Sequence, residues 1–338
     1  MTIREQMEKR EHEILSPYAS FSDLSKGRKR EEEPCDIRTC FQRDRDRILH
    51  CKSFRRLKNK TQVFLEPEGD HYRTRMTHTL EVSQIARTIA KALGLNEDLT
   101  EAIALGHDLG HTPFGHSGEA ALDDIFSGSG YGCFDHAEQS VRTVELIEKD
   151  GEGLNLSFEV IDGIRHHGLK DHPLTLEGDV VRLSDKIAYV NHDIDDALRA
   201  KVLREADIPA EYTRILGTSV KTRLNTLIHD VITASAGTDT VRMSEDVFGA
   251  LKGMREYLFR TVYESPVVKK VEKKAKRMLR ELFDYYMDNI NRIPESYRLF
   301  LEMGEPDYLV ISDYISGMTD QFAVQKYTEI FVPQGWQD

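Results

Sequence analysis

The sequence predicts an all-α protein, and three observations lead to this prediction. Apolar residues recur at three- and four-residue steps in most segments, as in helices that bury one face. Alternation with a period of two, which marks half-buried strands, is nearly absent, although short segments such as 61–65 are also compatible with a short strand. With 338 residues, 39% of them hydrophobic, the chain can bury one large core or two ordinary ones.

The expected helices follow one another along the chain. Residues 77–93 carry an apolar stripe and are followed by Gly94, a residue that suits a helix stop. The next helix, 97–107, runs into the breakers Gly106, Gly110 and Pro113. The polar segment 66–72 and the glycine-rich segment 127–135 are expected to be loops. Further apolar stripes predict helices at 117–126, 136–149, 157–166, 178–202 and 266–291.

Composition excludes several classes of protein. The chain has 58 acidic and 46 basic residues, and its net charge of −12 argues against a dedicated duplex-DNA binder. No apolar stretch approaches the roughly 18 residues of a membrane-spanning helix, and the start lacks the apolar core of a signal peptide. We expect a cytoplasmic protein with reduced thiols, because its cysteines are few and irregularly spaced: Cys35, Cys40, Cys51 and Cys133.

No clear linker divides the chain. We expect an N-terminal extension at 1–50, a core at 51–200 and a C-terminal helical subdomain at 201–338.

Two segments are strongly basic. Residues 43–60 suit a small polyanion such as a polyphosphate, but a solvated helix face explains them equally well. For residues 266–280 a solvated amphipathic helix is favoured over a site for an effector nucleotide or single-stranded nucleic acid.

Histidines are concentrated in one third of the chain, where ten of the 13 fall between His71 and His192. The densest stretch contains His107 and Asp108, and Gly106 and Gly110 flank this pair where a helix ends. Both side chains can therefore converge on one point. Imidazole and carboxylate together suit a divalent cation such as Mn²⁺, Fe²⁺, Co²⁺ or Zn²⁺.

Two further residues complete a candidate metal site. His78 lies near the start of its helix, beside the apolar stripe. Asp185 interrupts an otherwise apolar helix face, and a buried carboxylate needs a partner such as a metal ion. Each residue alone is more simply explained as a cap or a paired polar group. The four together favour a metal site.

Several longer motifs resemble the deoxyguanosine triphosphate triphosphohydrolase family of the HD-domain phosphohydrolase superfamily. The resemblance runs in order from about residue 43 to residue 200, and implies an HD-domain helical bundle as the catalytic core at 51–200. It identifies the metal ligands as His78, His107, Asp108 and Asp185. The motifs are RRLKNKTQVF (55–64), YRTRMTHTLEV (72–82), HDLGHTPFGHSGEAAL (107–122), FDHAEQSVR (134–142) and DKIAYVNHDIDDA (185–197).

The resemblance also implies a reaction and roles for the catalytic residues. A dNTP, dGTP or others, would be hydrolysed to a deoxynucleoside and intact triphosphate with the help of a divalent metal ion: Mn²⁺, Mg²⁺, Co²⁺, Fe²⁺ or Zn²⁺. His116 would donate a proton to the departing 5′ oxygen, and Glu119 behind it would fix its tautomer. His111 and His136 would contact phosphate. Arg75 matches a phosphate-binding arginine of the family, and guanidinium suits phosphate because it donates two parallel hydrogen bonds.

Sugar selection follows from the same resemblance. Gln62, Tyr189 and Asp193 match family residues that surround the deoxyribose, and Asp185, Tyr189 and Asp193 share one helix face. Tyr189 beneath C2′ would exclude a 2′-hydroxyl, while Gln62 and Asp193 would accept from the 3′-hydroxyl. The histidines His166, His167 and His172 could approach the triphosphate or line the site, but a hydrophilic loop is slightly favoured for them.

The expected partners are the dNTP substrate and further copies of the chain in a homo-oligomer, for which the resemblance suggests a hexamer. The resemblance does not decide whether a dNTP also binds as an effector or whether the protein binds nucleic acid. We expect no membrane association. Two alternative functions remain. One is another HD-type nucleotide phosphohydrolase or phosphodiesterase, and the other is a nucleotide sensor without catalysis.

Overall fold

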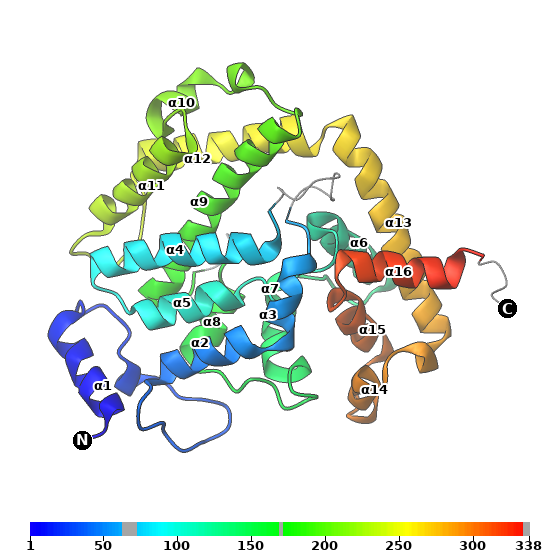
Figure 1. Ribbon diagram of the computed structural model, residues 1–338, viewed down its shortest axis with the longest axis horizontal. Coiled ribbons are helices and arrows are strands. Elements are labelled where there is room, and N and C mark those ends of the chain that lie inside the picture. Colours follow the sequence, from blue (N-terminus) through cyan, green and yellow to red (C-terminus); the bar gives the residue numbers. More distant parts are fainter. Residues whose placement is uncertain (63–72, 169–171, 334–338) are drawn as a thin grey trace.

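The structure is a computed structural model that describes residues 1–62, 73–168 and 172–333. Within these ranges the chain forms sixteen α-helices and no β-sheet, which confirms the all-α prediction (Figure 1). The helices are α1 (Ile3–Ile14), α2 (Cys40–His50), α3 (Lys52–Arg56), α4 (Arg75–Leu93), α5 (Glu97–Gly106), α6 (Gly115–Ser129), α7 (His136–Arg142), α8 (Phe158–Arg165), α9 (Leu176–Arg199), α10 (Ala210–Leu216), α11 (Val220–Ser235), α12 (Glu245–Leu258), α13 (Pro266–Asp288), α14 (Glu295–Glu302), α15 (Asp307–Ser316) and α16 (Asp320–Phe331).

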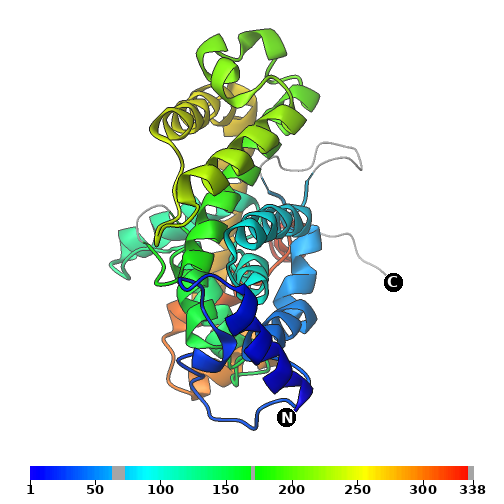
Figure 2. The same cartoon turned by 90° about the vertical axis from the view of Figure 1, so that its left-hand side faces the viewer.

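The first apolar core is built from helices on both sides of α4. Residues of α2, α5, α8 and α9 form its centre, and α11 and α12 extend it. In Figure 2 helix α1, in blue, lies at the opposite end of the molecule from α10–α12. Helices α4 and α9 begin with side-chain caps. The Thr74 side chain accepts from the Thr77 N–H at the start of α4, and the Thr175 side chain accepts from the Gly178 N–H at the start of α9. Helix α4 ends at Gly94, whose φ of 68° is left-handed as a helix stop requires.

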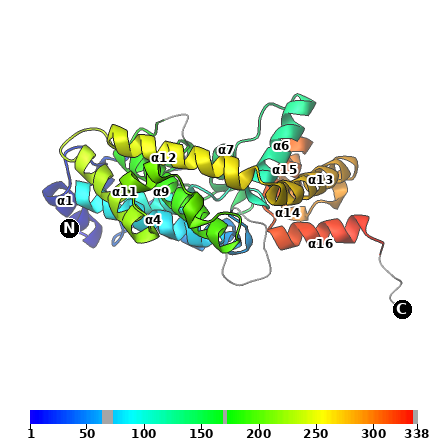
Figure 3. The same ribbon diagram turned by 90° about the horizontal axis from the view of Figure 1, so that it is seen from above.

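A second apolar core combines α6 with α13–α16. Figure 3 shows α6 beside α13, although more than a hundred residues separate them in the sequence. The segment between α5 and α6 therefore passes from one core to the other. The predicted boundaries at residues 50 and 200 stay a prediction.

Several predicted local features differ from the observed ones. Helix α6 begins at Gly115 rather than Ser117, because Phe114 adopts a left-handed conformation at its N-cap. The same helix continues through Ser129, so the loop expected from residue 127 begins only at Gly130. The helix expected at 136–149 is α-helical to Arg142 and continues as a π-helical turn at Thr143–Ile147.

The segment expected as a short strand, 61–65, lies mostly outside the described residues, as does the loop at 66–72. Thr61 is described and forms an isolated antiparallel bridge with Thr74. Six of the seven cations between Lys269 and Arg280 on α13 are exposed, in line with a solvated helix face.

Candidate active site

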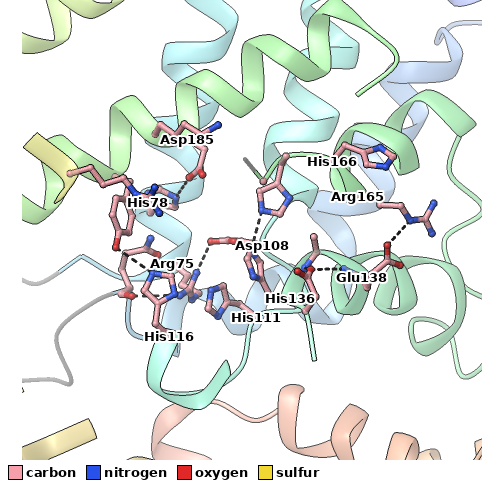
Figure 4. A pocket seen from close by; sticks show the side chains of 18 residues that line it. Arg75, His78, Asp108, His111, His116, His136, Glu138, Arg165, His166 and Asp185 are labelled. Atoms are coloured by element: carbon pink, nitrogen blue, oxygen red, sulfur yellow. Dashed lines mark hydrogen bonds and ion pairs between the residues drawn. The ribbon is translucent and has the colours of Figure 1, made fainter. Parts of the chain in front are cut away.

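A pocket of about 590 Å³ opens where the two cores meet (Figure 4). Side chains of α4, α7 and α9 line it, together with residues that follow α5 and begin α6. Of the twelve residues predicted to form the site, nine line this pocket: Gln62, Arg75, His78, Asp108, His111, His116, His136, Asp185 and Tyr189. The other three do not line it: His107 and Glu119 contact lining residues directly, and Asp193 reaches the lining through Tyr263.

The four predicted metal ligands converge on one point. His78 Nε2 lies 3.0 Å from Asp185 Oδ1. His107 Nε2 lies 3.6 Å from Asp108 Oδ1 and 3.8 Å from Asp185 Oδ1. Three separate elements contribute these groups, namely α4, the turn after α5, and α9. The geometry thus brings two imidazole nitrogens and two carboxylates together in one cluster, in which His78, His107 and Asp108 are buried and Asp185 is partly exposed.

The donor set fits a divalent cation. His107 Nδ1 donates to the Ala104 carbonyl at 2.7 Å, so Nε2 carries the ring's free lone pair. That nitrogen is buried and has no hydrogen-bond partner among the described residues. Burial alone would raise the pKa of Asp185, but the bond to His78 and the nearby His107 outweigh it and hold the pKa well below its usual value. A half-buried carboxylate anion beside an unused imidazole lone pair is the environment that a metal ion completes.

Residues behind the ligands orient them. His192 Nδ1 lies 3.3 Å from His78 Nδ1, and its other ring nitrogen bonds Glu81. Arg75 is almost fully buried and donates from Nη1 to Asp108 Oδ2 at 2.7 Å. Such partners fix the tautomer and orientation of metal ligands. Sequence reasoning missed His192 and Glu81, although Glu81 lies one helical turn beyond His78.

The predicted acid pair lies at the other end of the pocket, and a third residue joins it. His116 Nδ1 is 3.5 Å from Glu119 Oε2, while His136 Nδ1 is closer to Glu119, at 2.6 Å from Oε1. Burial alone would raise the pKa of Glu119, but these two histidines outweigh it and hold the pKa far below its usual value. The carboxylate is therefore a fixed anion shared between two imidazoles. His111 stacks on His136 with ring centroids 4.6 Å apart.

The hydrophilic loop favoured for His167 is wrong, because His167 is buried, lines the pocket and belongs to this cluster. Its Nδ1 donates to the Ile164 carbonyl, and its Nε2 lies 3.1 Å from His136 Nε2. Burial lowers the pKa of His167 to about 4, whereas Glu119 overcomes burial and raises the pKa of His136. His136 is therefore the donor and His167 the acceptor. Ligand atoms of Asp108, His136 and His167 also lie within 4.8 Å of one another.

The other two loop histidines separate. His166 lines the pocket and bonds Asp162 at 3.0 Å. His172 is exposed and pairs with Asp179 on the surface.

The predicted sugar residues form a hydrogen-bonded line with one unforeseen member. Tyr189 OH donates to Tyr263 OH at 2.5 Å, and Tyr263 OH donates to Asp193 Oδ2 at 2.6 Å. Tyr189 OH also lies 3.4 Å from His116 Nε2. Asp193 has no exposed surface, and burial raises its pKa to about 8. Asp193 is thus one tyrosine removed from the pocket.

The cations of the pocket are not those of the basic segment 43–60. Lys186, Arg165 and Arg255 line the pocket beside Arg75. Burial lowers the pKa of Lys186 to about 7. The sequence offered one signal for this residue, since it directly follows Asp185. No described residue of 43–60 lines the pocket, and three arginines of the segment pair with acids elsewhere: Arg43 and Arg47 with Glu32, and Arg45 with Asp98. Arg73, two residues before Arg75, pairs with Asp195 and Asp196.

Comparison with known proteins identifies the domains of this fold. Residues 75–190 match the family model of the HD domain, and residues 241–329 match that of the phosphohydrolase-associated domain. The helices that hold the four converging ligands are therefore those of an HD-domain protein. Among the described residues, no helix combines the length and the apolar character needed to cross a membrane.

Relatives that align along the whole chain give the particular family. A deoxyguanosinetriphosphate triphosphohydrolase-like protein of Caldanaerobacter subterraneus subsp. tengcongensis is 56% identical over 99% of this chain and 98% of its own length. Proteins of the same name from Desulfatibacillum aliphaticivorans and Clostridium tetani are 49% and 48% identical, over 98% and 99% of this chain and 99% and 97% of their own lengths. The chain belongs to the deoxyguanosinetriphosphate triphosphohydrolase-like family.

Proposed function

We propose that the protein is a metal-dependent dNTP triphosphohydrolase, with dGTP as its first candidate substrate. One observation carries the proposal. A buried set of metal-ligating groups and a His–Glu pair suited to proton transfer line or back the same pocket. The names of the relatives support the choice of substrate.

His78, His107, Asp108 and Asp185 would hold the cation. A divalent ion bound there would polarise a phosphoryl oxygen and lower the pKa of water. The protein's own groups then have to bind the triphosphate and move protons. Lys186, Arg165 and Arg255 surround the pocket, where they offset the roughly four negative charges of a triphosphate.

Hydrolysis at the α-phosphorus forms a bond to a water oxygen and breaks the bond to the 5′ oxygen. The departing oxygen must gain a proton, and the attacking water gives one up to solvent. His116 is the donor in this proposal. Glu119 accepts from its Nδ1, which leaves the proton on Nε2 to be transferred. Glu119 suits this task because its low pKa keeps it charged while the imidazole cycles.

Deoxyribose recognition rests on Tyr189 and Gln62. Tyr263 holds the hydroxyl of Tyr189, so the ring has a fixed position at the pocket wall, where it would exclude a 2′-hydroxyl. Gln62 Oε1 is buried and has no hydrogen-bond partner among the described residues, which makes it an acceptor for the 3′-hydroxyl. Asp193 supports this wall through Tyr263.

Product analysis tests the proposal. The protein is incubated with Mn²⁺ or Mg²⁺ and each dNTP, singly and all four together, and products are separated by ion exchange. Deoxynucleoside with intact triphosphate is expected, and the mixture reveals any need for an activating nucleotide. Orthophosphate or a monoester would assign another HD-type hydrolysis. No turnover in any mixture, with metal bound, would overturn the proposal in favour of a sensor.

A further inference from the structure

The turn that leads into α6 has a backbone conformation that needs support. Phe114 has φ 63°, a region that residues other than glycine rarely adopt, and Gly115 follows with φ 57°. A side chain at Gly115 would come within 2.9 Å of the Gln62 carbonyl. Such a conformation persists where surrounding groups hold it in place. His116 comes next, so this turn sets the direction of the proposed proton donor.

A carboxylate from the far end of the chain holds this turn. Asp320 Oδ1 accepts from the Phe114 N–H at 2.9 Å, and Oδ2 accepts from the Thr61 N–H at 3.0 Å. Thr61 directly precedes Gln62, the proposed sugar contact. One side chain therefore ties the strained turn before His116 to the segment that carries Gln62. These two hydrogen bonds form the Asp320 clamp.

A second contact reinforces the same junction. Lys60 is buried, and its Nζ donates to the His111 carbonyl at 2.5 Å and to the Ser316 carbonyl at 2.7 Å. The 111–116 segment is thus tied to both sides of the α15–α16 connection. Lys60 joins its start to Ser316 of α15, and Asp320 of α16 binds Phe114. All of these groups lie outside the cluster of four metal ligands.

An acidic residue in the first turn of a helix has a simpler role, which is to stabilise the helix dipole. Asp307 occupies the equivalent position of α15 and is exposed, and its side chain forms no hydrogen bond or ion pair with any described residue. Asp320 differs because both of its oxygens bind backbone groups outside its own helix. This difference separates a role in the active site from a role in helix stability.

We propose that Asp320 is a positioning residue for the hydrolytic site, acting through the Phe114–Gly115 turn on His116 and through Thr61 on Gln62. The proposal rests on the proposed function and extends it to the C-terminal segment that matches the phosphohydrolase-associated domain. It assigns to that segment the orientation of the acid end of the pocket.

The test compares Asp320→Asn and Asp320→Ala with Asp307→Asn as the matched control. Asn keeps one acceptor and places an amide donor against the second N–H, whereas Ala removes both bonds. We expect turnover to fall about 10- to 100-fold in both Asp320 variants, since misplacement of a catalytic group by about 1 Å has an effect of that size. Metal content and metal affinity should stay at the wild-type level. Asp307→Asn should change neither the turnover nor the binding of metal.

A purely structural role predicts another result. It would lower the melting temperature while the folded protein, assayed well below it, keeps its wild-type kcat. Wild-type kcat in folded Asp320→Ala would therefore overturn the proposal, and so would loss of bound metal. Hydrogen exchange of peptides that cover Thr61 and Phe114 provides a readout without substrate. Faster exchange of both in Asp320→Ala is expected, and unchanged exchange would contradict the clamp. If the wild type hydrolysed no dNTP, the proposed function would fail. Hydrogen exchange would still decide whether the Asp320 clamp exists, because it needs no substrate.

Discussion

The two ends of the pocket are held in different ways. The metal-ligand end is largely buried: the side chains of His78, His107 and Asp108 are at most 6% exposed and that of Asp185 is 25% exposed, and they come from α4, the turn after α5 and α9. At the acid end the side chain of His116 is 47% exposed, and it begins α6, a helix of the second core. A metal ion needs a rigid cage, whereas a proton donor must reach the leaving group of a bound substrate. Under the proposed function, the first core would supply affinity for metal and the junction of the cores would supply the proton donor.

The largest expected effect comes from breaking the metal-ligand end. Asp108→Asn removes one anionic ligand and the partner of buried Arg75. We expect loss of bound metal and of turnover to background, measured by elemental analysis and product chromatography on protein shown to be folded by circular dichroism. Asp124→Asn is the control, because Asp124 is an exposed carboxylate that, among the described residues, pairs with Lys276 alone. Full metal occupancy in Asp108→Asn would sink the ligand assignment.

Breaking the acid end should separate catalysis from binding. His116→Ala is expected to cut turnover by roughly 10²–10⁴-fold, as for a lost general acid, while metal and dNTP binding stay near the wild-type level. Calorimetric titration and steady-state rates measure the two properties. His172→Ala removes an exposed surface histidine and should leave both unchanged. Unchanged turnover in His116→Ala would remove this residue from the mechanism.

A smaller change at the metal-ligand end sharpens the comparison. His192→Ala removes the group that orients His78, so metal affinity should weaken by about 10- to 100-fold. At saturating metal, turnover should return close to the wild-type rate, because the acid end is untouched. A metal titration of activity provides the measurement, and exposed His229→Ala is its control. An unaltered titration midpoint would show that His78 needs no such support.

The smallest expected effect concerns stability. Burial raises the pKa of Asp193 from 3.8 to about 8, so the folded state binds a proton that the unfolded state has released between these values. The free energy of unfolding therefore loses this contribution as pH rises from about 4 to 8. Asp193→Asn has no such proton, so its stability relative to the wild type should increase from pH 5 to pH 8. Urea unfolding at both values measures this, and a constant difference would contradict the shifted pKa.

Much of the fold was predictable because helix periodicity is a local property. The stripe at 77–93 and the stop at Gly94 correspond to α4, and the spacing of Asp185 and Tyr189 corresponds to one face of α9. The start of α6 was predicted two residues late. The left-handed Phe114 has no composition signal, since only the packing around it makes that conformation stable.

The sequence by itself determined the all-α class, the family and the residue types of a metal site, because these depend on periodicity and on motifs written in short segments. Only the tertiary structure decided which groups those residues meet. Glu119 is shared with His136, Tyr263 lies between Tyr189 and Asp193, and Asp320 binds Phe114. The physical reason is distance along the chain: Asp320 and Phe114 are 206 residues apart, and a hydrogen bond between them leaves no trace in either local sequence.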